Sequence, residues 1–169
     1  MKKLGKAASF AVILAAVAAL AASSATSRGS SSRDFDARLS GFREVPAVST
    51  TGRGRLDVDL ANGVLRYRLS YSRLEADALF AHIHFAQARV NGGVIAFLCG
   101  GGDKPACPAR GGTVTGTIDP ADVIGPEEQG IAPGEFAEVV RAMRAVRTYA
   151  NVHTTKFPQG EIRGQIHRD

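Results

Sequence analysis

The stretch GRGRLDVDLANGVLRYRLSYS, residues 52–72, decides the fold class, because apolar and polar residues alternate along it. Leu56, Val58 and Leu60 share one face of a strand, while the charged residues between them share the other. Residues 61–63, Ala-Asn-Gly, are typical of a tight hairpin turn, since asparagine and glycine tolerate positive φ. After the turn, one face carries four apolar or aromatic residues: Leu65, Tyr67, Leu69 and Tyr71. The stretch therefore predicts an antiparallel hairpin with one apolar face.

Short segments of the same kind occupy most of the chain on both sides of this hairpin. They lie at 34–41, 79–86, 92–99, 112–118, 148–154 and 160–166. Two segments differ. Residues 133–146 carry apolar side chains at helical spacing, and 119–125 begin like a helical turn, with an Asp cap and Pro120. The pattern predicts an all-β fold: an antiparallel β-sandwich or open barrel of about eight short strands, with one amphipathic helix on the rim.

The first residues have the composition of a secretory signal peptide. Lys2, Lys3 and Lys6 precede an apolar run of thirteen residues, 10–22, and small residues follow it. We expect a signal peptide over 1–25, a Ser/Gly-rich flexible leader over 26–33 and one β domain over 34–169. The apolar run is shorter than the roughly 20 residues that a bilayer span needs. The expected location is secreted or periplasmic, with no membrane span after signal cleavage.

Charge and cysteine content restrict the function further. The chain has a formal net charge of +5, and without the three lysines of the first segment the remainder carries about +2. No basic run is interleaved with aromatic residues, so we expect no nucleic-acid partner. Cys99 and Cys107 flank a short loop rich in glycine and proline. In an exported protein such a pair predicts a disulfide, and a thiolate metal site is the rival interpretation.

Three histidines are the candidate functional residues. In FAHIHF, residues 80–85, strand parity places His82 and His84 on one face, roughly 7 Å apart along the strand. In the terminal segment, His153 shares a face with Asn151, and Glu161 lies across the predicted hairpin on that same face. Further polar residues continue this face on the return strand: Arg163 and Gln165. If the two segments are adjacent, the three imidazoles lie close together.

Two interpretations of this face remain open. Three histidines from strands, two of them in a His-x-His pair, form a recurrent set of ligands for zinc or copper, and Glu161 could be a fourth ligand or an orienting group. The alternative is a hydrogen-bonded cluster without a metal, in which Asn151, Arg163 and Gln165 fasten the hairpin. Arg163 on the same face disfavours a bare cation site.

Three blocks of the chain resemble the CHRD (chordin) domain family. They are LSGFREVPAVSTTGRGRLDVDL at 39–60, AHIHFAQARVNGGVIAFLC at 81–99, and TYANVHTTKFPQGEIRGQI at 148–166. The resemblance implies an extracellular all-β module, found in an animal antagonist of bone morphogenetic proteins and in exported microbial proteins. It implies no enzymatic activity and assigns no role to single residues. A weaker likeness to copper/zinc superoxide dismutases covers only the His-x-His pattern and the general architecture, and without a histidine-rich zinc loop we do not expect dismutase activity.

From residues and resemblance together we expect an exported, non-enzymatic binding or structural module, monomeric, with an extracellular partner that the sequence does not identify. The alternative is a periplasmic or extracellular copper- or zinc-binding protein that uses His82, His84 and His153. A metal-dependent oxidoreductase is a third and weaker alternative.

Overall fold

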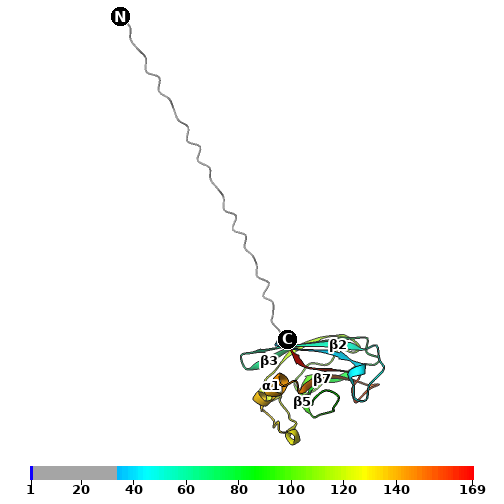
Figure 1. Cartoon of the computed structure of the whole chain (residues 1–169). Helices are drawn as coiled ribbons and strands as arrows, with labels where there is room; N and C mark the ends of the chain where they lie inside the picture. The colour runs from blue at the N-terminus through cyan, green and yellow to red at the C-terminus, as the bar shows by residue number, and fades with distance from the viewer. Residues whose placement is uncertain (2–33) are drawn as a thin grey trace. The chain divides into compact units, whose positions relative to one another are not determined.

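The computed structural model describes Met1 and residues 34–169. The predicted signal peptide, 1–25, and leader, 26–33, lie outside the described residues apart from Met1. The described domain is mostly antiparallel sheet, and eight of its strands form a nearly closed barrel (Figure 1). This confirms the predicted fold class.

The strands follow one another around the barrel in the order β5-β4-β7-β8-β1-β2-β3-β6, and a short ninth strand pairs with β1. One half of the barrel contains β1 (Phe35–Ser40), β2 (Arg53–Ala61), β3 (Val64–Ser72) and β6 (Gly112–Ile118). The other half contains β4 (Ala78–Phe85), β5 (Val94–Cys99), β7 (Thr148–Thr154) and β8 (Ile162–Gln165), and β9 is His167–Arg168. Across the gap between β5 and β6, the Tyr67 hydroxyl donates a hydrogen bond of 2.7 Å to the Leu98 carbonyl.

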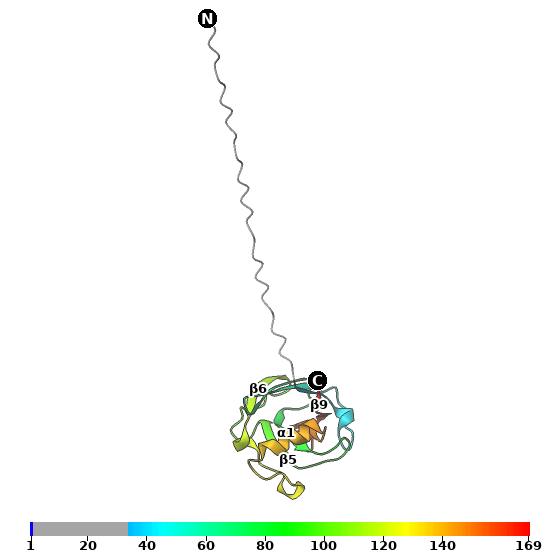
Figure 2. The ribbon, with the colours of Figure 1, turned by 60° about the vertical axis from the view of Figure 1, so that its left-hand side comes forward.

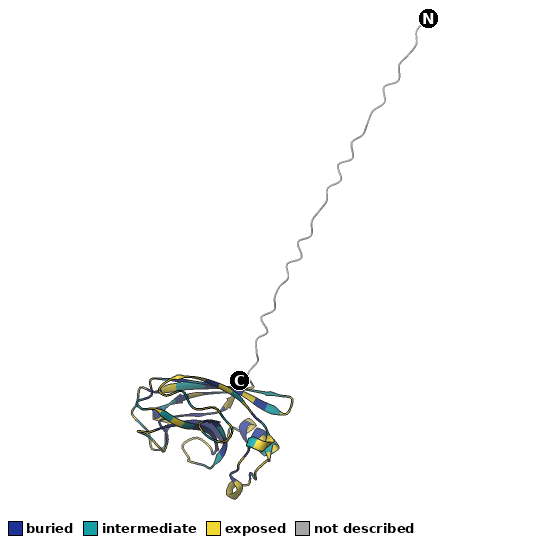
Figure 3. Ribbon diagram, turned by 180° about the vertical axis from the view of Figure 1, so that it is seen from behind, coloured by how far each residue is buried: buried dark blue, intermediate teal, exposed yellow. Residues whose placement is uncertain are grey.

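The hairpin predicted from residues 52–72 is present as β2 and β3. Its turn consists of Asn62 and Gly63, with φ of 53° and 77°, and Ala61 pairs with Val64. The inward positions are buried as the alternation predicts, except that Leu60 is partly buried. Buried positions alternate with intermediate positions in β2 and with intermediate or exposed positions in β3 (Figure 3). Side chains from all the long strands therefore meet in one apolar core inside the barrel.

The predicted helix is shorter than the apolar spacing over 133–146 suggests. Helix α1 runs from Phe136 to Arg144, because the backbone turns left-handed at Gly134 (φ 86°) before it and at Val146 (φ 56°) after it. The helix lies across one end of the barrel (Figure 2) and buries Val139 and Met143 completely. A helix on the rim is thus confirmed, with corrected boundaries.

Three short 3₁₀ helices lie in the connections: η1 (Gly41–Arg43), η2 (Pro120–Asp122) and η3 (Glu127–Gln129). At η2 the Asp119 side chain accepts a hydrogen bond of 2.8 Å from the Ala121 N–H, as the sequence predicts for a cap. Among the described residues, no helix is long and apolar enough to cross a membrane.

Candidate metal centre

The three histidines predicted as ligands lie together on the outer surface of the barrel. His82 and His84 belong to β4 and His153 belongs to β7, which pairs with β4 in antiparallel register. Their strand neighbours Ile83 and Val152 point into the core and are fully buried. One nitrogen from each imidazole can be chosen so that all three lie within 4.8 Å of one another.

The closest pair of imidazoles is His82 and His153. Their Nδ1 and Nε2 atoms lie 3.3 Å apart. This distance is compatible with a shared proton, and it also matches the edge of about 3.3 Å between two nitrogens that bind one zinc ion tetrahedrally at 2.0–2.1 Å. The widest separation in the cluster, 4.8 Å, exceeds that edge, so the rings would have to close by less than about 2 Å around an ion.

Two backbone carbonyls fix the orientation of the other rings. His84 Nδ1 lies 3.0 Å from the Gly92 carbonyl, and His153 Nδ1 lies 3.0 Å from the Pro158 carbonyl. A carbonyl oxygen only accepts hydrogen bonds, so both Nδ1 atoms carry the proton and both Nε2 atoms carry a lone pair. The Nε2 atom of His84 is buried and has no hydrogen-bond partner in the described part of the chain. Carbonyls in this position are the usual outer partners of metal-binding histidines.

The surroundings keep the imidazoles neutral. Burial lowers the pKa of His82 to about 3, and repulsion from His153 and His84 adds to this effect. Burial also lowers the pKa of His84 to about 4, and it lowers the pKa of His153. At neutral pH all three rings therefore have the uncharged form that binds a metal ion.

Aromatic rings enclose the cluster on several sides. Phe97 contacts the His82 ring edge-on at 4.4 Å between centroids, and Phe80 lies 4.9 Å from His82 and 4.8 Å from His153. Tyr149 stacks flat on His84, with 4.7 Å between centroids and 4° between planes. These rings limit the access of water and hold the imidazoles in place.

Arg163 is separated from the histidines by a tyrosine ring. Its guanidinium carbon lies 3.4 Å from the centroid of Tyr149, whose other face is covered by His84. Its nitrogens donate to Asn91 Oδ1 at 2.9 Å and to the Val90 carbonyl at 2.6 Å. The stack places an aromatic ring between the positive charge and the cluster, but the charge of Arg163 still lowers the pKa of His84. The sequence-based objection to a bare cation site therefore stands.

The predicted polar residues beside the histidines fasten loops to the outer face of the sheet. Asn151 donates to Glu44 Oε1 at 2.6 Å, and Gln165 donates to the carbonyls of Ala86 and Val146 at 3.0 and 3.1 Å. Sequence reasoning did not single out Glu44, although it lies in the family block at 39–60. The backbone carbonyls of Gly92 and Pro158, which orient two of the histidines, could not be predicted from the sequence, because every residue has a carbonyl.

The predicted position of Glu161 is wrong. Its carboxylate does not face His153 but accepts hydrogen bonds from the hydroxyls of Thr50 (2.7 Å) and Thr154 (2.9 Å) and from the Glu75 N–H (2.9 Å). Thr154 follows His153 on the strand and points to the opposite face. Glu161 is fully buried there and is not part of the histidine group, so we do not include it among the ligands.

The two cysteines form the expected disulfide. Cys99 at the end of β5 is bonded to Cys107, with 5.1 Å between the Cα atoms. The closed loop is held to the domain by the ion pair of Lys104 with Asp122, while Lys104 also pairs with its neighbour Asp103 inside the loop. A disulfide is consistent with an oxidising compartment outside the cytoplasm.

Fold and site together define an all-β barrel domain that presents a buried three-histidine cluster on its outer surface. The CHRD domain model matches residues 35–166, and the chain belongs to the CHRD domain family. No curated protein and no solved structure gives a significant match to the chain. The family is thus shown, and the chemistry of the histidines has to be argued from their geometry.

Proposed function

We propose that this CHRD domain is an exported, non-enzymatic module that binds one copper or zinc ion through His82, His84 and His153. The observation that carries the proposal is the unpartnered Nε2 lone pair of His84, buried beside two further imidazoles. An unpartnered buried nitrogen costs free energy, and a bound cation would remove that cost. The carbonyls of Gly92 and Pro158 support the proposal because they select the tautomer that a metal needs.

The ligand set narrows the choice of ion. Three neutral imidazoles without a thiolate suit zinc and copper, whereas calcium and magnesium require mainly oxygen ligands. Three protein ligands also leave a coordination position for water or for a partner's side chain. A module of this kind can carry a metal ion or use it to bind a partner, without any catalytic step.

The test is metal binding by protein purified without a histidine tag. We expect one equivalent of Zn²⁺ or Cu²⁺ by elemental analysis and calorimetric titration, and its loss in the triple variant His82→Ala/His84→Ala/His153→Ala. The matched control is His167→Ala, which removes the fourth and exposed histidine and should leave uptake unchanged. Equal uptake by wild type and a folded triple variant would show that hydrogen bonds alone hold the cluster together.

A further inference from the structure

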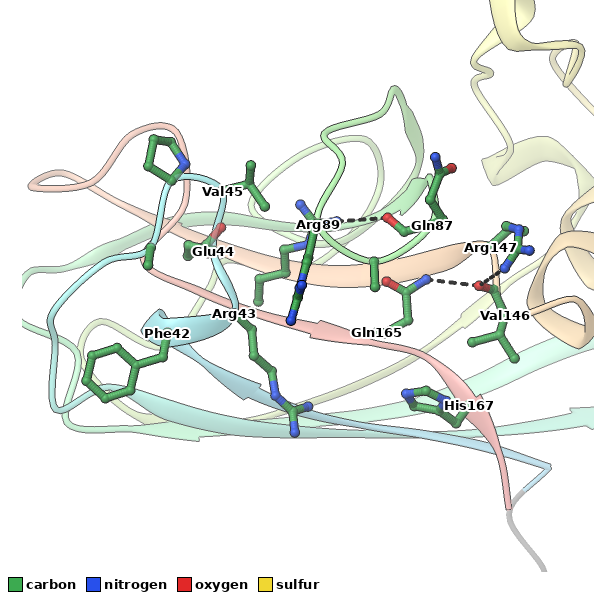
Figure 4. A pocket seen from close by; sticks show the side chains of 14 residues that line it. Phe42, Arg43, Glu44, Val45, Gln87, Arg89, Val146, Arg147, Gln165 and His167 are labelled. Carbon is green, nitrogen blue, oxygen red and sulfur yellow. Dashed lines mark hydrogen bonds between the residues drawn. The ribbon is translucent and has the colours of Figure 1, made fainter.

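A pocket of about 790 Å³ lies on the outer surface of the barrel (Figure 4). Its walls come from three connections that are distant in sequence: residues 42–47, residues 87–89, and residues 146–147. Arg163 and Gln165 of β8 also line it. The volume is within the range of about 300–1,000 Å³ that is usual for sites of small ligands.

The charge of this pocket is strongly unbalanced. Four arginines line it: Arg43, Arg89, Arg147 and Arg163. Arg43 and Arg147 donate only to backbone carbonyls, and among residues 34–169 no acidic side chain forms an ion pair with Arg43, Arg89 or Arg147. These three arginines are exposed, and each is on a different connection. Guanidinium groups bind carboxylate and phosphate oxygens in a fork geometry, so the pocket suits an anion.

The pocket has one acidic side chain, Glu44, which already accepts a hydrogen bond from the protein. Glu44 is buried, and its Oε1 accepts the hydrogen bond from Asn151. Burial raises the pKa of Glu44 to about 7, against the lowering effects of Asn151 and Arg163. At neutral pH it therefore compensates the arginines only in part.

Gln165 adds a feature that an anion alone does not explain. Its amide nitrogen donates hydrogen bonds to the carbonyls of Ala86 and Val146. Its Oε1 is buried and has no hydrogen-bond partner in the described chain. In Figure 4 this oxygen points into the pocket toward Arg89. Because an amide oxygen only accepts, it requires a ligand with an O–H or N–H group.

We propose that this pocket binds a small organic anion with a carboxylate or phosphate group for the arginines and a neighbouring hydroxyl or amino group for Gln165. Sugar acids and sugar phosphates have this chemistry. The site is separate from the three histidines, and its occupation requires no metal.

The test is calorimetric titration of the protein in EDTA at low ionic strength, so that failure of the metal site does not affect the result. The probes are glucuronate, glucose 6-phosphate, inorganic phosphate and neutral glucose. We expect one of the two sugar anions to bind with a stoichiometry of one, more tightly than inorganic phosphate, and glucose not to bind. Absence of binding by both sugar anions at 10 mM, on the order of the weakest specific affinities, overturns the proposal.

Arginine substitutions test whether the anion binds in this pocket. Arg147→Ala and Arg89→Asn should each weaken binding about tenfold, as expected for loss of a charged hydrogen bond. Asparagine is chosen at 89 because the backbone there is left-handed (φ 66°). The matched control Arg66→Ala removes an exposed arginine from β3 and should leave affinity unchanged. Equal weakening in all three variants would show a non-specific charge effect, and inorganic phosphate binding as tightly as the sugar anions would overturn the role of Gln165.

Discussion

Replacement of Glu44 by glutamine should make the protein more stable at alkaline pH. Glu44 follows η1, is 8% exposed, and accepts a hydrogen bond of 2.6 Å from Asn151 through Oε1. Its pKa is raised to about 7 because burial penalises the charged form. Glutamine has nearly the same shape, provides an amide oxygen that can accept the hydrogen bond from Asn151 in place of the carboxylate oxygen, and has no charge to bury.

The sign and size of the effect follow from proton binding. The folded state holds the Glu44 proton up to pH about 7, whereas the unfolded chain releases it near the ordinary value of 4.5. Between these values the folded state binds more protons, so the contribution of Glu44 to stability falls as pH rises. The difference of about 2.5 pKa units corresponds to about 3 kcal/mol above pH 7, and to almost nothing below pH 4.5.

Urea unfolding in EDTA at pH 5 and pH 8 measures this difference. We expect Glu44→Gln to exceed wild type by about 3 kcal/mol at pH 8 and by less than about 1 kcal/mol at pH 5. The matched control Glu128→Gln changes an exposed glutamate in η3 and should show no difference at either pH. If Glu44→Gln is equal to or less stable than wild type at pH 8, the burial argument is refuted, because the charged carboxylate would then be stabilising.

Two further changes test other buried polar groups. Glu161→Ala removes the acceptor of the Thr50 and Thr154 hydroxyls and should lower the free energy of unfolding by about 3 kcal/mol, with Glu161→Gln intermediate; a loss under about 1 kcal/mol would contradict this. The pKa of His84 is lowered, so the fold loses stability as pH falls from about 6.5 toward about 4 in EDTA. His84→Phe, which retains a ring against Tyr149, should reduce that pH slope near pH 5 by about 1.4 kcal/mol per unit, and an unchanged slope in urea unfolding would disprove it.

The barrel could be predicted because strand alternation reports burial directly. Leu56 and Tyr67 are inward because their strands bury only one face, and Asn62 and Gly63 provide the positive φ that the hairpin needs. Parity fails where a strand is irregular. Alternation places Leu79 on the same face of its strand as Ala81, which is fully buried, but the register shifts near the start of β4, and Leu79 is 40% exposed.

The candidate site could be predicted only in part, because alternation reports which way a side chain faces within a regular strand and not which strands are neighbours. Parity correctly places His82 and His84 on one face, but the pairing of β4 with β7 is what brings His153 to His82, 71 positions away, and no local pattern specifies that pairing. Glu161 was misplaced because it precedes β8 and lies outside the regular ladder, where alternation no longer dictates the direction of a side chain. The loop carbonyls of Gly92 and Pro158 depend on tertiary structure alone.

The interior of the barrel is apolar, and buried polar side chains gather on the outer face of β4, β7 and β8. Both candidate sites lie there, and the connection between β4 and β5 contributes to both. Its Gly92 carbonyl orients His84, while Val90 and Asn91 accept the hydrogen bonds of Arg163. Arg163 lines the arginine pocket on one side and stacks on Tyr149, the neighbour of His84, on the other. An anion and a metal ion would therefore be held by one continuous stack, with their charges separated by a tyrosine ring.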